Sequence, residues 1–109
     1  MSKDYKTYFK DIVDAIEKID KYTKDCDFEK FKSSSLISDA VIRNLAIIGE
    51  AVKNIPAEVK KDYDEIEWKK IAGFRDMVIH SYSNVDLEIV WDVVENKLSE
   101  LKRTCEKVI

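Results

Sequence analysis

The chain has 109 residues, a net charge of −3 and a pI of about 5.2. This length predicts one domain over residues 1–109, with a core small enough that assembly with a second copy would add useful stability. Hydrophobic residues make up 45% of the chain, which excludes a disordered polymer. The acidic balance argues against indiscriminate binding of nucleic acid, which usually requires a basic domain, although it permits a local basic patch.

The cysteines and the N-terminus favour a cytoplasmic protein with reduced thiols. Cys26 and Cys105 are far apart, no CxxC motif is present, and His80 is the only histidine, so no zinc site or other cofactor is expected. The N-terminus has no apolar signal core, and no run approaches the ~18 apolar residues of a membrane helix. We therefore expect a cytoplasmic protein that makes no contact with a membrane.

The first predicted element is a long helix. Apolar residues recur at steps of three and four from Tyr5 to Tyr22, which predicts about five helical turns that end near residues 24–27. A short helical turn over residues 27–31 follows, with Asp27 as its N-cap.

The next predicted helix is the most apolar one and is expected at the centre of the fold. Residues 33–35 are three serines that can cap its N-terminus, and its apolar stripe runs from Leu36 to Ile55. Pro56 ends it, because proline cannot continue the hydrogen-bond ladder. Gly49 lies inside this helix, where a glycine more often marks a close approach of two helices than a break.

The C-terminal half predicts further helices and no strand. A short helix is expected over residues 57–63, and a longer one that carries Trp68 to Val78 and the motif from Arg75 onward ends at a break over residues 81–85. A final helix follows, with Asn84 or Asp86 as its N-cap and apolar residues from Ile89 to Val108. The fold class predicted is all-α: an antiparallel up-and-down bundle of four main helices plus one or two short helices.

The segment from Arg75 to Tyr82 carries the residue types that cleavage of RNA without a metal requires. Histidine titrates nearest to neutral pH, so His80 suits proton transfer from a ribose 2′-hydroxyl. Arg75 is a permanent cation whose planar fork matches phosphate oxygens. Tyr82 offers a hydrogen-bond donor and a phenolic nucleophile. Asp76 lies four residues before His80 on the same helix face and could orient its imidazole.

The spacing within this segment leaves a geometric problem. Arg75 and His80 are five residues apart, which places them about 140° apart around a helix axis. They converge only if the arginine wraps around the helix, if the helix distorts, or if a second copy of the motif lies across a dimer interface. The same residues would also suit a surface ion pair and a helix cap.

A second group of charges lies on one face of the central helix. Asp39, Arg43 and Glu50 follow one another at steps of four and seven residues. They could support the motif or line its cleft, but we favour an ion network that ties helices together. The large aromatic residues near the motif are expected to pack in the core or in an interface rather than stack on bases: Trp68, Phe74 and Trp91.

Two separate blocks resemble the HepT family of HEPN domains. One runs from Trp68 to Tyr82 and continues to Trp91, and the other runs from Asp39 to Ala51. The likeness extends over nearly the whole chain. It implies a helical bundle that pairs as a homodimer or higher homo-oligomer, so that two motifs face one cleft.

The resemblance also implies a function and a partner. Members of the family are toxins of two-gene toxin–antitoxin modules and act as metal-independent endoribonucleases. Here Arg75 and His80 would be catalytic, with Asp76 and Glu50 in support. The partner implied is an MntA-like nucleotidyltransferase antitoxin that attaches AMP to the motif tyrosine, Tyr82. The added phosphate would compete with RNA for the arginine.

Two other functions remain compatible with the residues. The chain could be a non-catalytic nucleotide- or partner-binding subunit of a nucleotidyltransferase, which its low net charge favours mildly. It could also be a structural dimerisation domain in which the motif is only a cluster of ion pairs.

Overall fold

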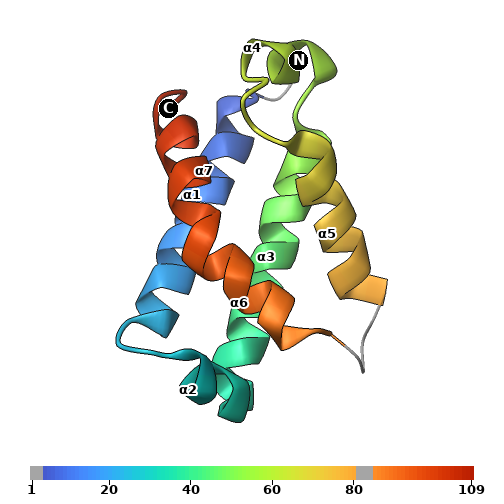
Figure 1. Ribbon diagram of the computed structural model, residues 1–109. Helices are drawn as coiled ribbons and strands as arrows, with labels where there is room; N and C mark the ends of the chain where they lie inside the picture. The colour runs from blue at the N-terminus through green and yellow to red at the C-terminus, as the bar shows by residue number, and fades with distance from the viewer. Residues whose placement is uncertain (1–3, 81–84) are drawn as a thin grey trace.

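The computed structural model describes residues 4–80 and 85–109, which form seven helices and no strand (Figure 1). The helices are α1 (Lys6–Thr23), α2 (Phe28–Ser33), α3 (Ser35–Asn54), α4 (Ala57–Asp62), α5 (Trp68–His80), α6 (Leu87–Asn96) and α7 (Leu98–Glu106). The predicted all-α class is therefore confirmed, and the scarcity of glycine and proline explains the length of α1 and α3.

Helices α1 and α3 form the centre of the bundle. They pack against each other along most of their length, and α7 also packs against α1 (Figure 1). The predicted apolar stripes face inward over most of their length, so that Phe9, Ile12 and Ile16 of α1 are fully buried, as are Val41 and Val52 of α3. Burial of such side chains contributes about 1.5–3 kcal/mol each. One predicted end of each stripe does not face inward: Tyr22 is 38% exposed and Leu36 is 82% exposed. The two longest apolar stripes in the sequence thus supply the core.

Side-chain caps begin three of the helices as the sequence predicts. Asp27 Oδ1 accepts a hydrogen bond of 2.8 Å from the backbone N–H three residues on, at the start of α2. Ser34 Oγ accepts one of 3.3 Å at the start of α3. Asp86 Oδ1 accepts 2.9 and 3.4 Å bonds at the start of α6, whereas the alternative cap, Asn84, lies outside the described residues. Helix α3 ends two residues before Pro56.

The prediction of one final helix over residues 89–108 is wrong. The backbone at Lys97 leaves the regular helical conformation, with φ −119°, and separates α6 from α7. Asparagine is a poor helix former, and the Asn96 amide donates to Asp92 Oδ1 at 2.7 Å just before the break. The apolar stripe nevertheless continues across it, from Val90 to Leu101, which is why periodicity gave no sign of the break.

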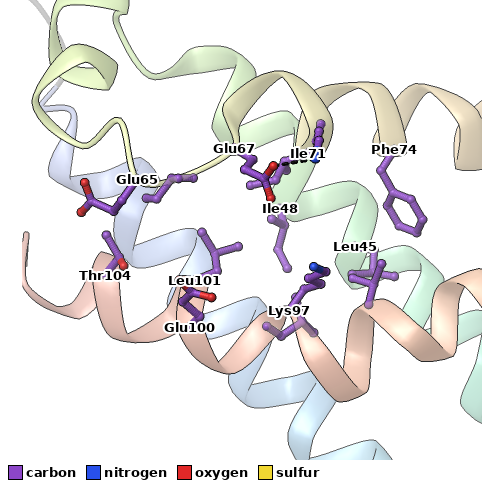
Figure 2. Close-up of a pocket in the computed structure, with 14 residues that line it drawn as sticks. Leu45, Ile48, Glu65, Glu67, Ile71, Phe74, Lys97, Glu100, Leu101 and Thr104 are labelled. Carbon is purple, nitrogen blue, oxygen red and sulfur yellow. Dashed lines mark ion pairs between the residues drawn. The ribbon is translucent and has the colours of Figure 1, made fainter.

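Helix α5 packs on α3 along one side and only sparsely on α6 and α7 (Figure 1). A pocket of about 310 Å³ fills the space between them, with α3 as its floor (Figure 2). Its apolar lining comes from α3, α5 and α7 and includes Leu45, Ile48, Ile71, Phe74 and Leu101. Charged side chains surround the apolar part: Glu65, Glu67, Lys70, Lys97 and Glu100.

Candidate functional site

The predicted motif lies on α5, which remains α-helical up to His80. The side chain of Arg75 is only 20% exposed and turns toward α3, whereas His80 is exposed. No hydrogen bond or ion pair between described residues joins Arg75 to His80. Tyr82 lies outside the described residues. A single undistorted helix therefore does not bring the arginine and the histidine of one chain together.

Two carboxylates hold the guanidinium of Arg75. Its Nη2 donates to Glu50 Oε2 of α3 at 2.8 Å, and its Nη1 donates to Asp76 Oδ1 at 3.1 Å. Charge-assisted bonds of this length are the strong class of protein hydrogen bonds. The Nε atom is buried and has no hydrogen-bond partner among the described residues. The two carboxylates thus balance the positive charge of Arg75 and fix the direction in which its guanidinium points.

The expected contact between Asp76 and His80 does not form within the described part of the chain. Asp76 Oδ1 instead accepts from Arg75 and, at 3.5 Å, from Nζ of Lys53 on α3. The arginine competes for this carboxylate because it is adjacent in sequence and carries a permanent charge. The hydrogen bond from Arg75 is the main reason that the pKa of Asp76 lies below its usual range. Asp76 therefore contacts the arginine and not the imidazole.

Of the three charged residues of α3 that were predicted to form an ion network, only Glu50 does so among the described residues. Glu50 connects α3 to Arg75, as an ion network between helices requires. Asp39 and Arg43 are exposed and form no ion pair with another described residue. Sequence reasoning missed Lys53, although its position three residues after Glu50 places both on one helix face.

Gly49 marks the close approach of α3 and α5 that its position in the sequence predicts. Gly49 is buried, and a Cβ atom added there would overlap Cβ and Cγ of Arg75. The aliphatic part of the arginine therefore lies directly on the backbone of α3. Gly73, the other glycine, is exposed on α5 and has no atom within 4 Å of the corresponding position.

The aromatic side chains near the motif pack within the molecule, as predicted. Trp68 contacts Phe9 edge-on with ring centroids 6.0 Å apart, and its indole Nε1 donates to two carbonyl oxygens at 3.1 and 3.2 Å. Trp91 packs against Phe31 at 5.0 Å. Phe74 lines the pocket in Figure 2. The two tryptophans are thus partly buried side chains that pack against the core.

The two cysteines are free thiols. Cys105 is fully buried, and burial raises its pKa to about 12. Within residues 4–80 and 85–109, no three His, Cys, Asp or Glu side chains gather in a way that could hold a metal ion. Over the same residues, no helix has the length and apolar character needed to cross a membrane.

Comparison with known proteins identifies the family of this chain. The family model described as "Ribonuclease HepT-like" matches residues 12–108 and so includes α3, α5 and their contact. The chain belongs to the HepT-like family. No solved structure shows a significant match to it.

Relatives of the HepT-like chain carry the names of ribonucleases. It is 42% identical over 108 residues to "Probable ribonuclease HepT" of Thermococcus cleftensis, covering 99% of this chain and 98% of the relative. It is 41% identical over 107 residues to a "Putative RNase" of Methanocaldococcus jannaschii, covering 98% and 92%. A longer protein of that organism, "Gamma-glutamylcyclotransferase and putative RNase", is 43% identical over the whole chain, which spans 49% of its length.

Proposed function

We propose that this HepT-like chain is a metal-independent endoribonuclease and the toxin of a two-gene toxin–antitoxin module. The observation that carries the proposal is that Arg75, a cation preorganised at the α3–α5 contact, lies on the same helix as the exposed His80. This pair occurs in a chain of the ribonuclease HepT-like family. A fixed cation and a proton carrier are the two groups that RNA cleavage through its own 2′-hydroxyl requires.

The proposed reaction is an internal transfer at phosphorus. His80 accepts the proton of the ribose 2′-hydroxyl while that oxygen forms a bond to the adjacent phosphorus. Arg75 stabilises the negative charge that gathers on the phosphoryl oxygens. The bond from phosphorus to the 5′-oxygen then breaks, and that oxygen takes up a proton. The products are a 2′,3′-cyclic phosphate and a 5′-hydroxyl.

A paired site follows from the geometry of α5. Because the helix is regular between Arg75 and His80, the two side chains lie about 140° apart around its axis. We therefore propose a homodimer in which two copies of α5 face one cleft, so that Arg75 of one subunit works beside His80 of the partner subunit. Assembly would also supplement the modest core of a chain of 109 residues.

The proposed switch is the attachment of AMP to Tyr82 by an MntA-like nucleotidyltransferase antitoxin. The modification would place a phosphate two residues from His80 and near the arginines of a paired cleft. That phosphate would occupy the cation that otherwise contacts RNA, which is a local electrostatic block.

The test of the activity uses the purified chain and RNA in the presence of EDTA. We expect cleavage that leaves 2′,3′-cyclic phosphate ends, and a loss of about 100-fold or more in His80→Ala and Arg75→Ala. Arg103→Ala is the matched control, because Arg103 is an exposed arginine of α7 without an ion pair to another described residue. Activity that survives in His80→Ala would refute the proposal. Tight nucleotide binding with no turnover would instead favour a non-catalytic subunit.

The test of the switch is mass spectrometry after co-expression with the neighbouring nucleotidyltransferase. AMP should appear on the peptide that contains Tyr82, and Tyr82→Phe should remain toxic in the presence of the antitoxin. An adduct on another residue would contradict the assignment.

A further inference from the structure

The stem of Arg75 lies across Gly49, and this contact distinguishes the two glycines of the chain. A Cβ atom at Gly49 would overlap the stem of Arg75, whereas one at Gly73 would meet nothing. Glycine inside a helix costs about 1 kcal/mol relative to alanine. At Gly49 the contact with Arg75 explains why a glycine is present despite this cost, because every other residue type has a Cβ atom that would overlap the stem.

We infer that Gly49 is a positioning residue for Arg75, in addition to allowing two helices to pack. This inference rests on the proposed function, in which the Arg75 guanidinium stabilises charge on the phosphoryl group. The Cβ and Cγ atoms of Arg75 lie against the backbone of α3 at Gly49, and from there the side chain extends along that helix. It then meets Glu50, the residue after Gly49, whose Oε2 accepts from Nη2 at 2.8 Å.

Neighbouring contacts complete the positioning. Asp76 Oδ1 holds Nη1 at 3.1 Å from the side of α5. The Nε atom is buried without a partner in the described part of the chain, and a buried unpaired donor costs free energy. Gly49 thus sets where the stem runs, and the two carboxylates set the direction of its charged end.

An alanine at position 49 would overlap the Cβ atom of Arg75, which no change of rotamer can move. The backbone of α5 would therefore have to move away from α3. That movement displaces the guanidinium from Glu50. A misplacement of about 1 Å in a catalytic group can lower the rate about 100-fold. The overlap also destabilises the fold, and for a domain of this size overpacking should lower Tm by about 10 °C.

The experiment compares Gly49→Ala with Gly73→Ala, its matched control, in the full chain. In Gly49→Ala we expect kcat to fall about 100-fold while KM rises by no more than about fivefold, because Arg75 contacts the phosphate in the bound substrate but acts more strongly on the charge that develops in the transition state. Assays run well below the Tm of each variant. Gly73→Ala should keep wild-type kinetics and gain a few degrees in Tm. Wild-type kcat in folded Gly49→Ala would overturn the inference.

A second pair of variants tests the contact itself, independently of activity. Arg75→Gly removes the atoms that an alanine at position 49 would overlap, so the added Gly49→Ala should then leave Tm unchanged or raise it. An equal drop in Tm in both backgrounds would overturn the inference. If Gly49→Ala alone does not fold, folding of the double variant supports the contact and failure of both refutes it. A wild-type chain without RNase activity would refute the proposed function, and the Tm comparison would still decide whether Gly49 places Arg75.

Discussion

Replacing Glu50 by glutamine should lower stability and strengthen RNA binding at the same time. In the structure the Glu50 carboxylate neutralises Arg75 through a 2.8 Å bond. A bound RNA phosphate would have to share the guanidinium with this carboxylate and would be repelled by it. Glutamine keeps an oxygen that can accept from Nη2 but removes the negative charge, so it separates the two effects.

The magnitudes follow from the exposure of the pair. Glu50 is 57% exposed, so the dielectric around it is close to that of water. Two unit charges about 4 Å apart then interact by about 1 kcal/mol, which corresponds to about fivefold tighter binding of RNA. An exposed ion pair contributes at most about 1 kcal/mol to stability, so Tm should fall by about 2–5 °C.

The assay measures the Kd of a 2′-O-methyl RNA oligonucleotide, which cannot be cleaved because its 2′-oxygen is blocked. Glu17→Gln is the control, since Glu17 is exposed on α1 and the variant has the same net charge. The gain in affinity should shrink at 0.5 M salt, where charges are screened over ~4–5 Å. Binding by Glu50→Gln that is no tighter than that of the control at low salt would refute the competition between Glu50 and phosphate.

Three further outcomes are expected. Because the hydrogen bond from Arg75 holds the pKa of Asp76 low, the charge of Asp76 stabilises the fold above the pKa of the unfolded state, and this contribution is lost as pH falls through the lower folded-state value. The difference in Tm between wild type and Asp76→Asn should therefore be constant near neutral pH and shrink below about pH 4. A thiol reagent should label Cys26 in the native protein but reach Cys105 only after unfolding, because Cys105 is fully buried with a pKa of about 12; mass spectrometry of labelled peptides checks this. Trp68→Phe should lower the free energy of unfolding by about 1–3 kcal/mol in urea titrations, because two carbonyl oxygens lose the indole donor.

The fold could be predicted from the sequence where apolar periodicity and caps agree. The stripes of α1 and α3, the N-cap Asp27 and the stop at Pro56 each depend on neighbours within a few residues, which the sequence contains directly. The break at Lys97 could not be predicted, because the apolar stripe of α6 continues in phase into α7. A local change of backbone angle there leaves the pattern of buried residues intact.

The candidate site was predictable in its residue types but not in its contacts. The sequence predicts that Asp76 orients His80 and that Glu50 joins Asp39 and Arg43 in an ion network or supports the motif. It does not show which partner the Asp76 carboxylate would bind. Asp76 contacts Arg75 and Lys53 because α3 brings a second helix to it, and that contact is long-range. Gly49 is the exception, since a glycine within an otherwise regular helix already indicated that another element comes close.

Helix α5 packs mainly against α3 alone, and this affects which part of the molecule unfolds first. Among the described side chains of α5 only Val78 is buried, and the pocket separates the helix from α7. Segments with few buried apolar contacts unfold locally at a lower free energy than the whole domain. Helix α5 should therefore detach as a unit while α1, α3 and α7 remain folded, and its backbone amides should exchange with solvent sooner than those of α3. The helix that bears Arg75 and His80 can then adapt to the proposed RNA substrate more readily than α3 can.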